Sequence, residues 1–314
     1  MKKPLVVLAG PTAVGKTELS ISLAKRINGE IISADSMQVY KYMDIGSAKI
    51  KYEEMQGIKH HLIDVLDPTE EFNVSLFQSL VKKSMVEIYE QGRIPILVGG
   101  TGFYIQAILY DIDFTKESSE KNTRKALTDF LHERGADALF ERLKEVDPKS
   151  AEAIHPNNTK RVIRALEYFY DTGELISVHN ERERKKESPY NFVYFVLNDK
   201  RDLLYQRIDR RVDLMMEQDL VSEVESLKKM GCNSEMTSMQ GLGYKEILSY
   251  LNGENSLTEA VDKIKRNTRR FAKRQLTWFR REPDVIWVDK DKFGYDEEKI
   301  LAFMLEKLED AACR

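Results

Sequence analysis

Mostly apolar runs alternate with helical patterns along the first hundred residues. The apolar runs, which are typical of strands buried in a parallel sheet, occupy residues 4–9, 30–35, 60–68 and 93–100. Residues 17–28 and 74–91 instead repeat apolar side chains at helical spacing. Strands that alternate with helices predict βαβ units, and hence a parallel sheet with helices on its faces.

The pattern changes after Asp113. Residues 114–190 are rich in charge and mostly helical in spacing, with capped helix starts in 147–154 and 155–170. Apolar strands return at 191–198 and 283–289, with long helical patterns between them, and a closing helix is expected over 296–312. The simplest architecture is an α/β core, residues 1–114 and 191–314, interrupted by a mostly helical insertion domain at 115–190.

A glycine-rich motif follows the first strand and opens the first helix. It fits G-x-x-x-x-G-K-[ST], whose glycines let backbone N–H groups close around phosphate oxygens at a helix N-terminus. Lys16 would neutralise the outer phosphate, and the Thr17 hydroxyl would be a ligand of Mg²⁺. The expected fold is therefore a P-loop NTPase-like core, although a plain glycine-rich turn is an alternative. The expected diphosphate-binding residues in this loop are Gly10, Pro11, Thr12, Ala13, Val14, Gly15, Lys16 and Thr17.

The strand that would complete a nucleotide hydrolase lacks its acid. In such enzymes a second strand ends in an Asp that holds Mg²⁺. Here the run at 93–100 leads into Gly99, Gly100, Thr101 and Gly102. The missing carboxylate disfavours an ATPase or GTPase and favours phosphate as a ligand or leaving group. The glycines are explained by a tight turn, by close approach of a bulky substrate, or by both.

Asp35 ends the second strand, at the edge where open α/β sheets bind ligands. Ser36, Met37 and Gln38 follow it directly. Beside a magnesium diphosphate, the Asp35 carboxylate could accept a proton from an attacking amine or hydroxyl. Asp is also a frequent helix N-cap, and the residues alone leave both roles open.

One predicted helix is strongly basic, although the chain as a whole is nearly neutral. The 49 Lys and Arg and 52 Asp and Glu sum to −3, yet residues 263–281 hold nine Lys or Arg and no acid. The expected core-facing stripe is Val261, Ile264, Thr268, Phe271, Gln275 and Trp278. Solvated charged helices normally mix signs, so this composition favours nucleic acid as the partner of the basic face.

Further arginines and lysines are candidates for phosphate binding. Of Arg207, Arg210 and Arg211 we assign Arg211 to the diphosphate, although the pattern does not distinguish the three. A second basic cluster in the insertion comprises Arg124, Lys125, Lys160, Arg161 and Arg164.

Other chemistries are disfavoured by composition. No run approaches 18 apolar residues, so no membrane-spanning helix is expected. His60 and His61 would point to opposite faces of a strand, which makes a poor metal site. Cys232 lacks the neighbours of a catalytic thiol, and with Cys313 it cannot form a disulfide framework. We expect a cytoplasmic monomer.

Eight ordered segments resemble the tRNA dimethylallyltransferases of the IPP transferase family, which isopentenylate an adenosine beside the anticodon. They are residues 10–17, 32–40, 43–49, 60–68, 98–107, 155–167, 241–246 and 266–281, so the resemblance covers nearly the whole chain. It implies that the loop binds dimethylallyl diphosphate rather than ATP, with Mg²⁺ as cofactor. It also implies Asp35 as general base for the adenine N6 amine, with Lys16 and Thr101 as the other catalytic residues.

The resemblance further implies a grip on the tRNA anticodon stem-loop. The expected contacts are Asp35, Ser36, Met37, Gln38, Thr101, Arg124, Lys160, Arg161, Arg164, Gly243, Tyr244, Lys245, Arg269, Arg270, Lys273 and Arg274. The activity so implied is transfer of the dimethylallyl group to N6 of the adenosine at tRNA position 37, with release of diphosphate. The adenine must first leave its stack, which requires a pocket and backbone clamps.

Two other functions share the phosphate loop. A small-molecule or nucleoside kinase would use ATP as donor, but it leaves the basic helix without a task. A nucleic-acid-binding NTPase would use that helix, but the missing strand-end acid opposes it.

Overall fold

The computed structural model describes residues 2–114 and 121–312. The chain divides into two compact units, Met1–Leu109 with Pro189–Arg314 and Tyr110–Ser188. We call them the core unit and the insertion unit. The core unit is therefore built from two stretches of chain that are distant in sequence.

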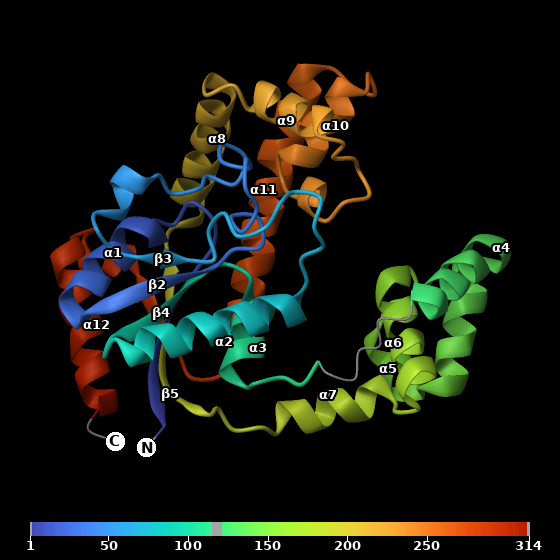
Figure 1. Cartoon of the computed structure of the whole chain (residues 1–314), viewed down its shortest axis with the longest axis horizontal. Helices are drawn as coiled ribbons and strands as arrows, with labels where there is room; N and C mark the ends of the chain where they lie inside the picture. Colours follow the sequence, from blue (N-terminus) through green and yellow to red (C-terminus); the bar gives the residue numbers. More distant parts are fainter. Residues whose placement is uncertain (1, 115–120, 313–314) are drawn as a thin grey trace. The chain divides into compact units, whose positions relative to one another are not determined.

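The core unit contains a six-stranded parallel sheet (Figure 1). Its strands are β1 (Lys3–Ala9), β2 (Gly29–Ala34), β3 (His60–His61), β4 (Ile94–Gly99), β5 (Tyr190–Asn198) and β6 (Val285–Asp289). They lie in the order β3-β2-β4-β1-β5-β6, so β1 is central, between β4 and β5. The predicted parallel α/β core is confirmed.

Only two residues of the stretch 60–68 join this sheet. His60–His61 pair with β2, and Leu62 and Asp64 then take left-handed backbone angles, with φ of 63° and 55°. An extended strand cannot continue through such residues. Leu66 returns to form an isolated parallel bridge with Tyr40. The prediction of a full strand over 60–68 is therefore wrong.

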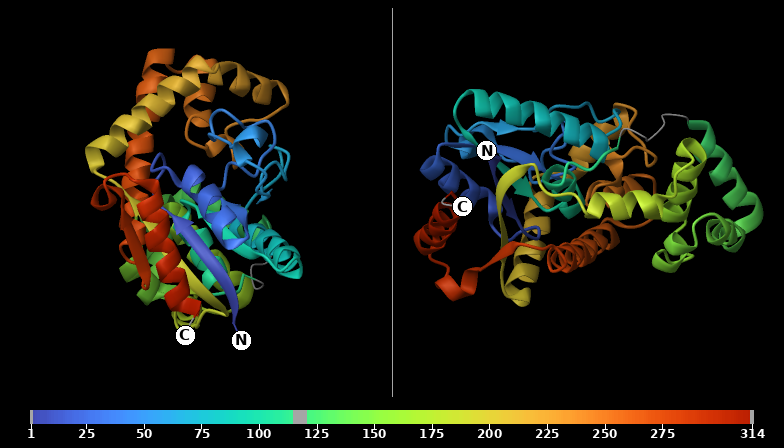
Figure 2. Two further views of the ribbon diagram at one scale, coloured as in Figure 1. Left: turned by 90° about the vertical axis from the view of Figure 1, so that its left-hand side faces the viewer. Right: turned by 90° about the horizontal axis from the view of Figure 1, so that it is seen from below.

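Helices cover both faces of the sheet. The helices of the core unit are α1 (Lys16–Ile27), α2 (Val74–Glu90), α3 (Gly102–Leu109), α8 (Arg201–Glu217), α9 (Leu220–Lys229), α10 (Tyr244–Leu251), α11 (Leu257–Phe279) and α12 (Glu297–Ala312), with 3₁₀ turns η1 (Tyr52–Met55), η2 (Ser238–Gln240) and η3 (Lys290–Phe293). Helices α1 and α12 share one hydrophobic core with Val6 and Leu8 of β1. Because side chains alternate along a strand, Leu5 and Val7 face the opposite layer, on the side of α2 and α3 (Figure 2).

Helix α11 is the predicted basic helix, and it contacts α3, α8 and α10. Its buried side chains are Ala260, Ile264, Ala272, Gln275 and Phe279. The prediction is right at Ile264 and Gln275, but Phe279 is buried where Trp278 was expected. The predicted stripe repeats every 3.5 residues, whereas an α-helix turns every 3.6. Over the four turns that follow Ile264 the buried line therefore drifts by about 0.4 residue, toward Phe279.

The insertion unit is helical throughout its described regular structure. Its helices are α4 (Lys121–Val146), α5 (Pro148–Ala153), α6 (Thr159–Thr172) and α7 (Ile176–Arg184). Helix α4 bends at Gly135, whose φ of 83° is left-handed. The predicted cap at Asp147 is confirmed, because its carboxylate accepts the Ser150 N–H at 3.1 Å. Leu139, Leu143 and residues of α6 form the hydrophobic core of this unit.

The structure bears on two expectations from composition, a chain without a membrane-spanning helix and a Cys232 without a catalytic role. Over 2–114 and 121–312, no helix has both the length and the apolarity that crossing a membrane requires. Cys232 is a buried free thiol, and burial raises its pKa, which fits the absence of a catalytic role. Cys313 lies outside the described residues.

Candidate active site at the carboxyl edge of the sheet

Three strands of the core unit end level with one another. Gly99 of β4 aligns with Ala9 of β1 and with Ala34 of β2. Because all three strands run in the same direction, the segments that follow them begin at the same edge of the sheet. Those segments are the phosphate loop, residues 35–38 and the turn 99–102. The sheet register therefore brings together the three segments that the sequence singled out.

The phosphate loop turns into α1 through left-handed backbone. Ala13 has a φ of 63°, and Gly15, the N-cap of α1, has a φ of 92°. Glycine adopts this conformation without the steric cost of a Cβ. The first N–H groups of α1 have no carbonyl partner within the helix, and the helix dipole adds positive potential there. This end of α1 is therefore suited to bind an anion.

Lys16 folds back over the loop. Its Nζ donates to the carbonyl oxygens of Gly10 at 3.0 Å and Pro11 at 2.8 Å. Burial lowers the pKa of Lys16 to about 7, repulsion by Arg211 contributes in the same direction, and attraction by Asp35 opposes both. An arriving diphosphate would restore the full charge of Lys16 by supplying the missing counter-ions.

Arg211 is the arginine of α8 that shares this environment. Burial lowers the pKa of Arg211, while the carboxylates of Asp35 and Glu18 raise it. By contrast, Arg207 is paired at 2.6 Å with the buried Asp199, and Arg210 is exposed. The electrostatic neighbours of Arg211 and the ion pair of Arg207 therefore distinguish arginines that the sequence pattern left equivalent.

Asp35 serves as a cap, but of a turn rather than of a helix. Its Oδ1 accepts the Met37 N–H at 2.8 Å, and no helix begins at this point. Among the residues that the structure describes, none donates a hydrogen bond to Oδ2 of Asp35. One carboxylate oxygen therefore fixes the side chain and leaves the other available for proton transfer. The roles of cap and of general base, which the sequence left open for Asp35, are therefore compatible.

Thr101 lies in a turn whose glycines are required by packing against α11. A Cβ on Gly100 would lie 2.1 Å from Nε2 of Gln275, and one on Gly102 would lie 2.2 Å from Cδ1 of Trp278. Neither approach leaves room for a methyl group. Contact with α11 is thus an additional reason for glycine beside Thr101, which is itself partly exposed.

The segment 35–38 is held by its neighbours. The Gln38 amide accepts from the Ser33 hydroxyl at 3.1 Å and donates to the Ala48 carbonyl at 3.3 Å. Met37 lies against Gly241, where a Cβ would be 2.6 Å from the Met37 sulfur. Ser36, Met37 and Gln38 are partly exposed, so the segment presents a shaped surface beside Asp35.

Tyr244 is a structural anchor. Its ring is fully buried, and its hydroxyl donates at 2.8 Å to Glu223, which also accepts the backbone N–H groups of residues 44–46. The buried ring offers no surface to tRNA, and the tRNA contact expected at residue 244 stays a prediction. Gly243 is the buried N-cap of α10, and Lys245 is exposed.

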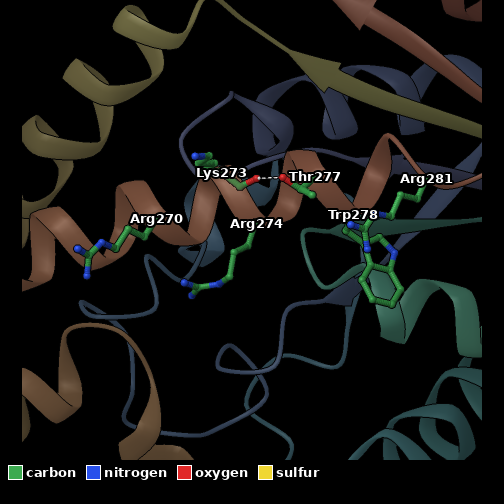
Figure 3. Close-up of a pocket in the computed structure, with 6 residues that line it drawn as sticks. All are labelled: Arg270, Lys273, Arg274, Thr277, Trp278 and Arg281. Carbon is green, nitrogen blue, oxygen red and sulfur yellow. Dashed lines mark hydrogen bonds between the residues drawn. The ribbon is translucent and has the colours of Figure 1, made fainter. Parts of the chain in front are cut away.

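An open groove follows the outer side of α11 (Figure 3). Arg270, Arg274 and Trp278, spaced by four residues, extend to the same side of the helix in this view. The groove is lined by Arg270, Lys273, Arg274, Thr277, Trp278 and Arg281. Over the described part of the chain, none of its four cations has an acidic partner within ion-pair distance. Cations beside an apolar ring are a surface suited to nucleic-acid phosphates and bases.

Not every cation of α11 is available in this way. Arg269 is paired with Asp209, and Lys265 is paired with Asp213 at 2.5 Å. Both acids lie on α8, so these two cations fasten α11 to its neighbour. Arg269 was among the residues that the sequence predicted to contact tRNA, and its ion pair with Asp209 makes it less available than Arg270.

Two arginines of the insertion unit share one acid. Glu167 is paired with Arg124 at 2.9 Å and with Arg164 at 3.7 Å. Lys160 and Arg161, at the start of α6, are exposed. The unit therefore presents at least two exposed cations next to a pair of arginines that share one carboxylate.

Two residues contact the phosphate loop although the sequence did not predict this contact. Gln275 accepts the Thr12 N–H and donates to the Gly100 carbonyl, both at 3.0 Å. Lys290 donates its Nζ to the Val14 carbonyl at 3.3 Å. Lys290 directly follows β6 at the same sheet edge, a position that could have indicated it. The helical pattern places Gln275 on the buried stripe of α11, but nothing local indicates its contact with the phosphate loop.

Comparisons with known proteins identify the family. The family model described as IPP transferase matches residues 38–282. A tRNA dimethylallyltransferase of Lachnoclostridium phytofermentans is 60% identical over 294 residues, which cover 94% of each chain. The chain therefore belongs to the IPP transferase family.

Solved structures agree with this assignment. The full-length tRNA isopentenylpyrophosphate transferase of Bacillus halodurans superposes with a TM-score of 0.73 at 47% identity, over 99% of this chain and 98% of that one. A eukaryotic dimethylallyltransferase, crystallised acting on tRNA, has a TM-score of 0.79 at 34% identity, over 91% of this chain and 74% of that one. The predicted resemblance is confirmed.

Proposed function

We propose that this protein transfers the dimethylallyl group of dimethylallyl diphosphate to N6 of the adenosine at tRNA position 37, releasing diphosphate. The observation that carries the proposal is the arrangement at one edge of the sheet. An anion-binding loop follows β1 and a carboxylate with one anchored oxygen follows β2, on the two sides of β4, in a chain 60% identical to a tRNA dimethylallyltransferase. The loop is suited to bind the leaving diphosphate, and the Asp35 carboxylate is suited to accept the proton of the amine.

The diphosphate is held by the loop and its cations. Backbone N–H groups of residues 13–17, which lead into α1, surround its oxygens, while Lys16 and Arg211 supply charge. As the bond from the allylic carbon to oxygen breaks, the electron pair leaves with the diphosphate. Donors and cations already in place stabilise that developing charge without reorganising.

The loop also suits a divalent cation shared with the substrate. Among the described residues, no group of three or more His, Cys, Asp or Glu could hold a metal unaided. The Thr17 side chain is exposed at the start of α1, and Mg²⁺ commonly takes one or two protein oxygens together with phosphate oxygens and waters. We propose Thr17 as its protein ligand, and the ion would supply additional positive charge to the diphosphate.

Asp35 takes the proton of the attacking amine. Adenine N6 forms the new bond to the allylic carbon and must lose one proton. The Oδ1 of Asp35 is fixed by Met37, so Oδ2 can be directed at the amine without loss of orientation. Thr101 follows β4, the strand between β1 and β2, and helps to position the adenine.

The tRNA is gripped by basic surfaces. The groove of Arg270, Lys273, Arg274 and Arg281 binds the backbone, and Trp278 offers an apolar face beside it. Lys160, Arg161 and the arginines around Glu167 provide further phosphate contacts in the insertion unit. Ser36, Met37 and Gln38 form the wall against the flipped base.

The identity of the donor substrate, dimethylallyl diphosphate or ATP, distinguishes this function from that of a kinase. The turn after β4 holds no acid, and the comparisons give no support to a kinase. Incubation of the protein and unmodified tRNA with either dimethylallyl diphosphate or ATP should yield N6-dimethylallyl adenosine from the first donor alone. Phosphoryl transfer from ATP, with no alkylated nucleoside from the prenyl donor, would contradict the proposal.

A further inference from the structure

Gln275 is a polar side chain in the buried stripe of α11. Only 6% of its surface is exposed, and its helical neighbours on that stripe include Ala272 and Phe279. A buried amide is costly unless its donors and acceptors are paired. Its position therefore calls for a specific explanation, which its two partners supply.

The two ends of the amide bind two different active-site segments. Its Oε1 accepts the N–H of Thr12 in the phosphate loop, and its Nε2 donates to the carbonyl of Gly100, next to Thr101. The partners fix the orientation of the amide, because the Thr12 N–H can only donate and the Gly100 carbonyl can only accept. One planar group thus spans the diphosphate cradle and the Thr101 turn.

The packing of α11 strengthens this bridge. Gly100 allows Gln275 to approach, and Gly102 allows Trp278 to pack three residues further along the same helix. Both neighbours of Thr101 are therefore in contact with α11. The spacing between Thr101 and the phosphate loop cannot change unless these contacts break.

We propose that Gln275 is a positioning residue for dimethylallyl transfer. It sets the separation between the bound diphosphate and the turn that carries Thr101, and so the distance between the allylic carbon and the adenine amine. This inference rests on the proposed function. Reactions of this kind are sensitive to such spacing, since a misplacement of about 1 Å can cost a factor of about one hundred in rate.

Replacement by glutamate separates positioning from packing. In the Gln275→Glu variant, the protonated carboxyl is isosteric with the amide and can still accept from Thr12 and donate to Gly100. The ionised form cannot donate, and burial next to a carbonyl oxygen favours the protonated form. The ratio of kcat in this variant to that of the wild type at the same pH should therefore rise as the pH is lowered from 8.5 to 6.

Gln275→Met preserves size but has no donor. We expect its kcat/KM to fall by a factor on the order of ten to a hundred at every pH, because two buried backbone groups lose their partner. Gln91→Glu and Gln91→Met are matched controls, since Gln91 is exposed at the end of α2, before β4 begins, and so lies at the opposite sheet edge. Both controls should retain wild-type kinetics.

Amide hydrogen exchange tests the hydrogen bond between Gln275 and Thr12 without a measurement of enzyme activity. The Thr12 N–H should exchange at least about tenfold faster in Gln275→Met than in wild type, at a temperature where both proteins are folded. An inactive wild type would refute the proposed function, and the exchange result would still decide on Gln275. If the wild type is active, two results would overturn the inference. One is a kcat/KM of Gln275→Met within twofold of the wild-type value. The other is a ratio of Gln275→Glu kcat to wild-type kcat that does not change with pH.

Discussion

The Oδ1 of Asp35 accepts the backbone N–H of Met37 at 2.8 Å, while Oδ2 receives no hydrogen bond from the residues that the structure describes. The two oxygens of one carboxylate therefore have different tasks. The first orients the side chain at the end of β2, and the second remains able to take a proton. Substitutions that keep one oxygen can test this division.

Asp35→Asn should abolish most of the turnover and leave the fold intact. Its amide oxygen can still accept the Met37 N–H, but an amide cannot act as a base at neutral pH. We expect kcat to fall by about 10² to 10⁴, with tRNA affinity unchanged within about threefold. Single-turnover kinetics and tRNA binding measured on the same sample check this.

Asp35→Ala is the matched comparison, because it removes the base and the turn cap together. Its thermal midpoint should fall below that of Asp35→Asn, while both variants stay equally slow. If Asp35→Asn kept near-wild-type kcat, the proton would have to go elsewhere and the assignment of Asp35 as base would be wrong.

Binding of the prenyl donor should weaken as the pH rises above 7. The pKa of Lys16 is lowered to about 7 by burial and by Arg211, so Lys16 loses its charge above that pH in the free protein. The bound diphosphate favours the charged form, so binding at pH 8 must take up a proton, whereas binding at pH 6 need not. Affinity should fall by up to about tenfold per pH unit above 7.

Calorimetry with dimethylallyl diphosphate in two buffers of different ionisation enthalpy measures this proton uptake directly. We expect an uptake approaching one proton at pH 8 that disappears in Lys16→Met. Equal heats in both buffers at pH 8 would show that Lys16 is already charged before the donor arrives.

The cations of α11 should contribute unequally to tRNA binding. Arg270→Ala with Arg274→Ala removes two charges from the groove, so the salt dependence of the affinity should flatten by about two phosphate contacts. Arg269→Ala, whose guanidinium is paired with Asp209, should change that slope less. Lys83→Ala, on the exposed side of α2, controls for loss of charge alone. If the tRNA affinities of the double variant and of wild type depended equally on salt, the proposal that α11 contacts tRNA would be wrong.

Tyr244→Phe should affect stability rather than tRNA binding. The change removes the hydrogen bond to Glu223 and leaves the buried ring in place. Hydrogen bonds to charged groups contribute about 1.5–3 kcal/mol, so we expect a loss of this order in the free energy of unfolding. Denaturant titration measures it, with tRNA affinity expected to stay within twofold. A large loss of affinity in a fully stable variant would return Tyr244 to the tRNA surface.

The sequence predicted the parts of the site that are encoded locally. The phosphate loop and Asp35 follow apolar strands directly, so their place at the sheet edge follows from the parallel arrangement. The bridge from Gln275 to Thr12 joins residues 263 positions apart, and no local pattern reveals it. Likewise, only the packed structure shows that Arg269 is engaged by α8 and that Arg211, rather than Arg207, is near the loop.

The fold was predictable for a similar reason. Long apolar runs and capped helices are local signals, whereas the strand expected over 60–68 was stopped by left-handed residues at Leu62 and Asp64. The burial of Phe279 in place of Trp278 reflects a gradual helical drift that a strict heptad pattern ignores.

The central claim is that the loop holds a diphosphate as leaving group, and isotope-labelled dimethylallyl diphosphate tests it most directly. After incubation with unmodified tRNA, the nucleosides are separated by mass spectrometry and the released diphosphate is quantified. The account predicts labelled N6-dimethylallyl adenosine at a single tRNA position, with one diphosphate released for each modified base. Diphosphate released without labelled adenosine, or label found on another nucleoside, would contradict it.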